Sequence, residues 1–225
     1  MKKTDQTLVS YLTRDELQAL LDAPDTSTVS GIRDRAMLHL TFAAGLRVSE
    51  LVGLRLDQID RQGASTVHII GKGRRERILP LWKETAAAVK AWLKVRPLST
   101  APELFLNARG QAMTRDGFEY ILAKHVATAS RVAPSIARKR VSPHVLRHTC
   151  AMHTLQATRD VRKVSLWLGH ASLQSTEPYL RADPTEKLEA LSTMTPPMLK
   201  PGRFRATDTL LAMLSTARRK QNYMD

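Results

Sequence analysis

Cysteine, glycine, proline and long apolar runs are all scarce in this sequence, and each scarcity excludes a class of protein. The single cysteine, Cys150, excludes an internal disulfide. With 10 glycines and 11 prolines in 225 residues and a hydrophobic content of 43%, the composition is that of a folded globular chain. No apolar run is long enough to cross a bilayer, and the opening residues lack the apolar core of a signal peptide. We therefore expect a cytoplasmic protein that does not enter a membrane.

Acidic residues are in the minority as well. Lysine and arginine number 35 against 21 aspartates and glutamates, which gives a formal net charge of +14. A field of this sign attracts polyanions, and the simplest polyanionic partner is a nucleic acid. The alternative is a basic surface that only contacts solvent.

The stretch from Ser142 to Asp183 gathers four histidines, an HxxR motif and a tyrosine. Ser142 followed by Pro143 predicts a helix start, because serine caps free N–H groups and proline suits the first helical position. At helical spacing His144, Arg147 and His148 share one arc. The opposite arc carries residues expected to pack: Val145, Leu146, Thr149, Cys150 and Met152. A basic arc at a helix N-terminus calls for an anion, and phosphate is the natural candidate.

A zinc site is the weaker interpretation of the same histidines. His144, His148 and His153 recur along the predicted helix, but no carboxylate or second cysteine stands at ligand spacing. We therefore expect no metal here, and we expect Cys150 to pack rather than react.

Arg47 and Glu50 form a second feature of interest, directly after a predicted helix (residues 32–45) that ends at Gly45. The two residues stand three positions apart, on one helical face. They can form a structural ion pair inside the fold, or Glu50 can orient Arg47 toward an external anion. The local sequence leaves both interpretations open.

A basic hairpin is predicted between these two features. Thr66–Ile70 and Ile78–Leu81 are typical of strands, and the turn Gly71–Arg77 between them carries Lys72, Arg74 and Arg75. Taken alone, such a tip is more often solvated than functional.

Local signals place the remaining elements. A capping box, Thr13 to Glu16, predicts a first helix, and Asp160 and Gly169 bracket a helix that ends beside His170. Further elements are predicted as follows: helices Glu84–Val95, Arg115–Ser130, Pro184–Leu191 and Thr209–Leu214, a brief strand Leu104–Leu106, and a basic loop Ser135–Arg140. In that loop Arg138, Lys139 and Arg140 are placed for phosphate contacts. Prolines and a glycine at 196–202 predict a linker.

Taken together, these motifs resemble the tyrosine recombinase/phage integrase family. The elements that carry the resemblance occur in order from about Leu12 to Asp183: Gly45–Leu51, Lys72 in its hairpin, His144-x-x-Arg147, Leu168-Gly169-His170 and Tyr179. The resemblance implies a mainly α fold with a small antiparallel β-sheet. It also implies DNA strand cleavage and rejoining without metal, ATP or another cofactor.

The resemblance assigns a role to each site residue. Arg47 and Arg147 clamp the phosphate, Tyr179 is the nucleophile, and His144 accepts its proton. Lys72 protonates the leaving oxygen, and His170 hydrogen-bonds the phosphate. Glu50 holds Arg47 in place. For His148 and Trp167 a structural role is favoured.

Two departures from the family pattern qualify these expectations. The family carries an N-terminal core-binding domain, whereas here we expect a catalytic domain over residues 1–195, a linker and tail helix over 196–225, and no core-binding domain. Pro178 precedes the nucleophile and predicts a turn or helix start there. The expected partners are double-stranded DNA and further copies of the chain, or a second recombinase, on that DNA.

The favoured function is site-specific recombination for a mobile element. A type IB topoisomerase would share the same strand-cleavage chemistry. The other alternative is a truncated DNA-binding regulator without catalysis.

Overall fold

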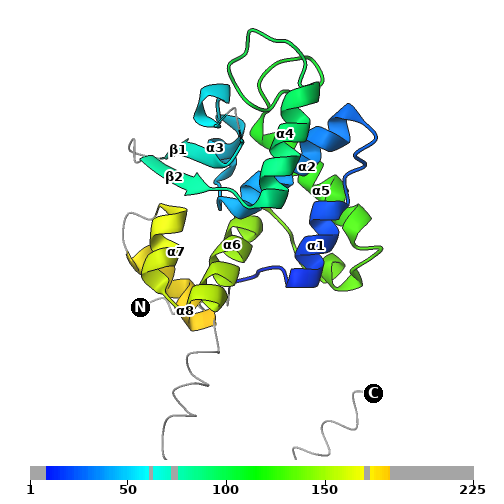
Figure 1. Cartoon of the computed structure of the whole chain (residues 1–225). Helices are drawn as coiled ribbons and strands as arrows, with labels where there is room; N and C mark the ends of the chain where they lie inside the picture. Colours follow the sequence, from blue (N-terminus) through cyan, green and yellow to red (C-terminus); the bar gives the residue numbers. More distant parts are fainter. Residues whose placement is uncertain (1–8, 61–62, 72–75, 170–172, 183–225) are drawn as a thin grey trace, which may run out of the picture. The chain divides into compact units, whose positions relative to one another are not determined.

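The computed structural model describes residues 9–60, 63–71, 76–169 and 173–182 (Figure 1). All of these residues belong to one compact unit, Met1–Lys187. Its helices are α1 (Arg14–Asp22), α2 (Val29–Ala43), α3 (Val48–Val52), α4 (Lys83–Val95), α5 (Arg115–Ala129), α6 (Pro143–Thr158), α7 (Val161–Leu168) and α8 (Glu177–Ala182). Short 3₁₀ helices are η1 (Leu56–Gln58), η3 (Pro134–Arg138) and η4 (Leu173–Thr176), and the strands are β1 (Thr66–Ile70) and β2 (Glu76–Pro80). The predicted mainly α fold with a small sheet is confirmed.

The two strands form an antiparallel hairpin in which His68 stands opposite Ile78 and Ile70 opposite Glu76. The predicted start of the second strand was wrong, because β2 begins at Glu76 and takes Glu76 and Arg77 out of the expected turn. The reason is the alternation of the strand: Ile78 points to solvent and is 68% exposed, so Arg77 and the buried Leu79 share the inner face.

The brief strand expected over Leu104–Leu106 was also wrong. Leu106 forms only an isolated bridge with Ala112, and no ladder follows it. The backbone N–H of Leu104 is instead donated to the carbonyl of Leu54, while Phe105 accepts from Met113. These single bonds tie the segment to two different neighbours, so it does not pair as a strand with either.

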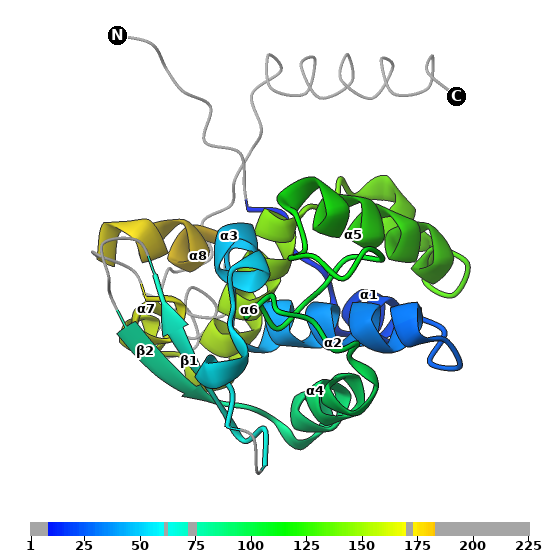
Figure 2. The same ribbon diagram turned by 90° about the horizontal axis from the view of Figure 1, so that it is seen from above.

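Helix α2 is the central element of the core. Met37, Leu38 and Leu40 are fully buried, and the helix contacts α1, α3, α4 and α6 (Figure 2). Every residue of α2 from Ala36 to Ala43 is buried, so neighbouring elements cover this half of the helix on all sides. Because α2 ends at Ala43, its C-terminus fixes the position of Gly45 and of Arg47 just beyond it.

Two predicted helix starts, those of α1 and α6, rest on caps that the structure confirms. The predicted start at residue 32 was wrong, because Thr28 caps α2 and the helix begins at Val29. Thr13 and Glu16 exchange side-chain-to-backbone hydrogen bonds in a capping box at α1. The Ser142 side chain accepts from the N–H of Val145 at the start of α6. No helix in the described ranges is long and apolar enough to cross a membrane.

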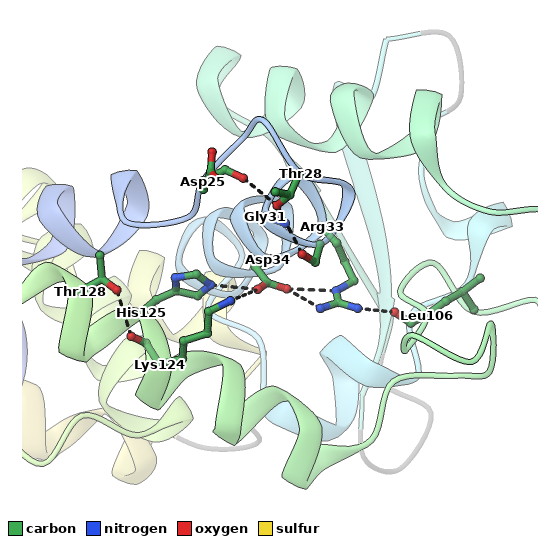
Figure 3. A network of polar contacts seen from close by, with 10 residues as sticks. Asp25, Thr28, Gly31, Arg33, Asp34, Leu106, Lys124, His125 and Thr128 are labelled. Carbon is green, nitrogen blue, oxygen red and sulfur yellow. Dashed lines mark hydrogen bonds and ion pairs between the residues drawn. The ribbon is translucent and has the colours of Figure 1, made fainter.

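A buried ionic network joins α2 to α5 (Figure 3). Asp34 is 1% exposed, and its carboxylate accepts hydrogen bonds of 2.7 and 3.0 Å from Arg33 and lies 2.9 Å from Nε2 of His125. Arg33 also donates to the carbonyl of Leu106. Burial alone would raise the pKa of Asp34, but the hydrogen bonds from His125 and Arg33 outweigh burial and lower it.

We predict that Asp34→Asn lowers the free energy of unfolding by about 3–5 kcal/mol at pH 7, because it leaves the largely buried guanidinium of Arg33 without its anion. The folded-state pKa of Asp34 is lowered, so this stabilisation is present above its unfolded pKa of about 4 and is lost as the pH falls through the folded value. Urea unfolding at pH 7 and in acid measures both effects. The control is Lys124→Ala, with an expected loss below about 1 kcal/mol, because the Lys124 side chain is 53% exposed and its amine lies 3.8 Å from Asp34.

Candidate active site

Arg147 lies at the centre of the site, on the second turn of α6. Its side chain is 5% exposed, and its guanidinium donates to the carbonyl of Gly45, after α2, and at 2.8 Å to the carbonyl of Leu168, at the end of α7. Helix C-termini carry partial negative charge, which favours a cation at this position. The arginine thus joins three helices, α2, α6 and α7, at one point.

Gly45 is required for this junction. Its φ is +56°, a left-handed conformation that strains residues with a Cβ. A Cβ at this position would also lie 2.4 Å from Cδ2 of Leu168 and 3.2 Å from Sγ of Cys150. A larger residue would therefore strain the backbone here and force the side chain of Leu168 to move.

Arg47 and Glu50 form the ion pair that their spacing predicts. Arg47 precedes α3, and Glu50 accepts its backbone N–H at 3.0 Å and its guanidinium at 2.9 Å. The Arg47 side chain is 39% exposed while that of Glu50 is 5% exposed. Both interpretations that the sequence left open therefore apply. The carboxylate of Glu50 is buried in the fold, and it holds the guanidinium of Arg47, which is partly exposed.

Arg77 also forms an ion pair with the carboxylate of Glu50, a contact that the sequence did not predict. It donates to Glu50 at 2.8 Å from the inner face of β2, and its side chain is 9% exposed. Burial alone would raise the pKa of Glu50, but Arg77 and Arg47 outweigh burial and lower it. Glu50 is therefore ionised at neutral pH and ties the hairpin to α3.

Arg147 stays charged at neutral pH even though it is buried. Burial, together with the nearby charges of Arg47 and Arg77, lowers its pKa to about 10, with Glu50 acting in the opposite direction. Three arginines and one buried carboxylate therefore form a cluster with excess positive charge. Such a cluster is suited to bind a phosphate.

Tyr179 lies beside this cluster, in the first turn of α8, and is 3% exposed. Its Oη is 2.9 Å from Nδ1 of His148, and the two rings meet edge to face with centroids 5.6 Å apart. Burial raises the pKa of Tyr179, and the charges of Arg147 and Arg47 partly oppose this rise. Pro178 sits inside the first turn of α8, which confirms the predicted helix start.

For His148 a structural role was favoured from the sequence, and the structure adds a contact that the sequence did not predict. Its ring is half-buried, as expected for packing, but Nδ1 contacts the hydroxyl of the predicted nucleophile. No local signal could have found this contact, because the two residues are 31 positions apart. For Arg77 a signal existed: counting back two residues from the apolar Leu79 places it on the inner face of its strand.

Other predicted residues divide between described and undescribed positions. His144 is described and exposed, near the start of α6. The remaining predicted site residues, Lys72, Arg74, Arg75 and His170, lie outside the described residues. So do the predicted linker, the tail helix and the domain boundary at residue 195.

The segment predicted as a basic loop, Ser135–Arg140, lies largely in η3 (Pro134–Arg138), and its three cations differ in exposure. Arg138 and Arg140 are exposed. Lys139 is half-buried, and its amine donates at 2.6 Å to Glu16 and at 2.8 Å to the carbonyl of Tyr11. Lys139 therefore holds the loop against α1, and its two neighbours face solvent.

The structure also bears on the predicted absence of a zinc site and on the packing roles predicted for Cys150 and Trp167. Within the described part of the chain no group of three histidine, cysteine or acidic residues is placed to hold a metal ion. Cys150 is 1% exposed and burial raises its pKa to about 12, so it packs as predicted. Trp167 donates to the carbonyl of Ala43 and packs on the core, which confirms its structural role.

Solved structures of DNA recombinases share this fold. The XerH site-specific recombinase bound to palindromic difH substrate, in a post-cleavage complex, matches with a TM-score of 0.71 and 27% identity over 86% of this chain and 55% of that one. The XerA recombinase matches with a TM-score of 0.67 and 25% identity over 95% of this chain and 66% of that one. The fold is therefore that of a tyrosine recombinase catalytic domain.

Sequence comparison gives the family. Residues 10–186 match the model of the phage integrase family, and the chain belongs to that family. The provisionally named integrase/recombinase y4rC of Sinorhizobium fredii is 44% identical over 96% of this chain and 65% of its own length. Tyrosine recombinase XerD of Listeria innocua is 40% identical over 79% of this chain and 59% of its own length. The chain thus spans less than two thirds of the length of these relatives.

Proposed function

We propose that this chain catalyses site-specific DNA recombination by cleaving and rejoining strands through a 3′-phosphotyrosyl intermediate. The observation that carries the proposal is the geometry around Tyr179, a buried phenol bound by an imidazole and lying within the field of Arg47 and Arg147. Membership of the phage integrase family and the names of the relatives support it.

The arginines supply the electrostatic part of this mechanism. A phosphodiester is anionic and repels a nucleophile, and its pentavalent transition state gathers still more charge on the non-bridging oxygens. The side chain of Arg47 is held by Glu50 and is partly exposed, and that of Arg147 is held by two backbone carbonyls. Their guanidinium groups therefore present N–H donors in fixed positions. His144, exposed near the start of α6, and the predicted ligand His170 add hydrogen bonds to the phosphate.

The covalent step exchanges one ester for another. Oη of Tyr179 attacks phosphorus, the P–O bond to the 5′-oxygen breaks, and Lys72 is the predicted donor of the proton that this oxygen takes up. Attack by a 5′-hydroxyl then reverses the step and releases the tyrosine. Because the phosphotyrosyl ester keeps the energy of the broken bond, the chemistry needs no ATP, metal or other cofactor.

Double-stranded DNA is the proposed partner, and the charge of +14 supports this choice. Exposed Arg138 and Arg140 serve as phosphate contacts near α6, and Arg74 and Arg75 are predicted contacts on the hairpin. We infer that recombination joins several copies of the chain, or this chain and a second recombinase, on DNA in the cytoplasm. A role in integrating or excising a mobile element is supported by the name of the y4rC relative, an integrase/recombinase.

The test is covalent capture on a pool of nicked duplexes with randomised sequence, in which cleavage near the nick releases a short fragment and prevents rejoining. We expect a protein–DNA adduct that withstands denaturant, and its digestion should yield a nucleotide-bearing peptide that contains Tyr179. Sequencing the trapped DNA then gives the preferred site. Salt-sensitive DNA binding without any adduct would favour the regulator instead.

A second measurement separates recombination from topoisomerase activity. Duplexes that carry two copies of the captured site should exchange strands, whereas a type IB topoisomerase relaxes supercoiled plasmid without exchanging partners. Relaxation without exchange would contradict the proposed recombinase and favour the topoisomerase.

A further inference from the structure

We propose that His148 is the general base that takes the proton of Tyr179 as the phenol attacks phosphorus. This inference rests on the function proposed above and names the residue that activates its nucleophile. A general base must lie within hydrogen-bond reach of the proton that it removes. Nδ1 of His148 meets this condition, at 2.9 Å from Oη of Tyr179.

Helix geometry separates His148 from His144, to which the family resemblance assigns the proton. The two histidines stand one turn apart on α6, a rise of about 6 Å along the axis. His144 is exposed near the helix start, where an incoming phosphate can reach it, and His148 lies deeper, where α6 packs against α8. The position along the helix therefore assigns His144 to the phosphate and His148 to the nucleophile.

The surroundings keep His148 in the form that can accept a proton. Burial lowers its pKa, and the neighbouring His144 and the charge of Arg147 on α6 lower it further. Among residues on other elements, Tyr179 on α8 faces His148. The charge of Arg47, which precedes α3, also acts on Tyr179. At neutral pH His148 is therefore a neutral imidazole, with one ring nitrogen free of a proton.

Tyr179 requires such a partner. Its pKa is raised by burial, so the phenol keeps its proton at neutral pH in the absence of DNA. Arg147 and Arg47 act in the opposite direction and stabilise the phenolate character that develops during attack. The pKa of the phenol is raised and that of the imidazole is lowered, so both groups are neutral before the reaction. The phenolic proton has an acceptor only 2.9 Å away.

The proposed step conserves protons and bonds. As the new P–O bond to Oη of Tyr179 forms, the phenolic proton moves to Nδ1 of His148 and an imidazolium results. The P–O bond to the 5′-oxygen breaks, and that oxygen takes its proton from the leaving-group acid, predicted to be Lys72. In the rejoining step the 5′-hydroxyl attacks phosphorus and gives its proton back to Lys72. The P–O bond to Tyr179 breaks, and the imidazolium returns its proton to Oη of the departing tyrosine.

The first test needs no DNA. Nitrogen-15 NMR of histidine-labelled protein at pH 7, with the His148 signals assigned by comparison with His148→Asn, reports which ring nitrogen carries the proton. We expect a neutral ring with the proton on Nε2 and none on Nδ1. A proton on Nδ1 would mean that His148 donates to the tyrosine oxygen, and the proposal would be overturned.

The second test is single-turnover cleavage of the captured duplex by His148→Asn. The amide oxygen of asparagine can accept the hydrogen bond from Tyr179 but cannot take its proton, so we expect the rate to fall by about 10²- to 10⁴-fold. The wild-type rate should decrease as the pH falls through the lowered pKa of His148, and this decrease should be absent from the variant. A merely structural role predicts a wild-type rate and a wild-type pH profile.

The matched control is His153→Gln, a half-buried histidine on the same helix whose Nε2 bonds the carbonyl of Leu12. Its rate should stay within about threefold of the wild type. If the wild-type chain forms no adduct, the proposed function fails, and this role fails with it. If the wild type forms the adduct and His148→Asn forms it equally fast, only the role of His148 is overturned.

A substrate with sulfur in place of the bridging 5′-oxygen separates the base from the leaving-group acid. Sulfur leaves readily without a proton, so this substrate should restore cleavage by Lys72→Ala. It should leave the defect of His148→Asn in place, because activation of the nucleophile is still required. Restoration of the His148 variant to the wild-type rate would assign His148 to the leaving group and contradict the proposal.

Discussion

Tyr179→Phe is expected to form no covalent adduct with DNA, because the substitution removes the only atom of this side chain that can attack phosphorus. Binding of the same duplex should stay within about threefold of the wild type, since the ring still fills its buried site and no charge is lost. The free energy of unfolding should fall by about 1 kcal/mol, the usual net value of one hydrogen bond. Denaturing gels, a DNA titration and urea unfolding measure the three quantities.

The control for this prediction is Tyr120→Phe, on a ring that is 73% exposed on α5. It removes the same atom from a tyrosine outside the site, so adduct formation should be unchanged. An adduct formed equally by Tyr179→Phe and the wild type would show that another residue is the nucleophile. Both the mechanism and the role of His148 would then fail.

Arg147→Lys is expected to slow single-turnover cleavage by about 10³-fold. Lysine keeps the positive charge but replaces a planar fork by a single ammonium group, which cannot hold the carbonyls of Gly45 and Leu168 and a phosphate in the same geometry. Affinity for DNA should change little, because the net charge is unaltered. The comparison of cleavage rate with DNA affinity therefore separates transition-state stabilisation from simple attraction.

Arg131→Lys is the matched control, because Arg131 is exposed and is not among the residues assigned to the active site or to DNA contacts. It should leave both the rate and the affinity within about threefold of the wild type. Since the pKa of Arg147 is about 10, wild-type Arg147 is charged throughout the neutral range, and its own ionisation should not shape the rate there. Full activity of Arg147→Lys would contradict the clamp and leave Arg147 as a structural link between helices.

The helix boundaries could be predicted from sequence because they depend on contacts within one turn. The capping box of Thr13 and Glu16, the start at Ser142 and the stop at Gly169 each involve neighbours a few residues apart. The pairing of Arg47 with Glu50 was predictable for the same reason. The strand start at Glu76 was missed because Glu76 and Arg77 are both charged, and the sequence alone does not distinguish the inward-facing Arg77 from a residue of a polar turn.

The links that assemble the site could not be predicted in this way. Arg77 and Glu50 are 27 positions apart, and Arg147 and Gly45 are 102 positions apart. Periodicity places a residue on a face but does not say what packs against that face. The family resemblance supplied the list of site residues, and the structure added which of the described members touch and through which atoms.

The two carbonyl contacts of Arg147 affect when the entropy of its side chain is lost. A guanidinium has five N–H donors, and the contacts with Gly45 and Leu168 occupy one on each terminal nitrogen, so the others remain for a phosphate. Ordering an arginine side chain costs about 2 kcal/mol of rotamer entropy. Because folding already orders this side chain, its entropy is not lost again when DNA binds. A DNA phosphate therefore meets N–H groups of Arg147 that are already in position.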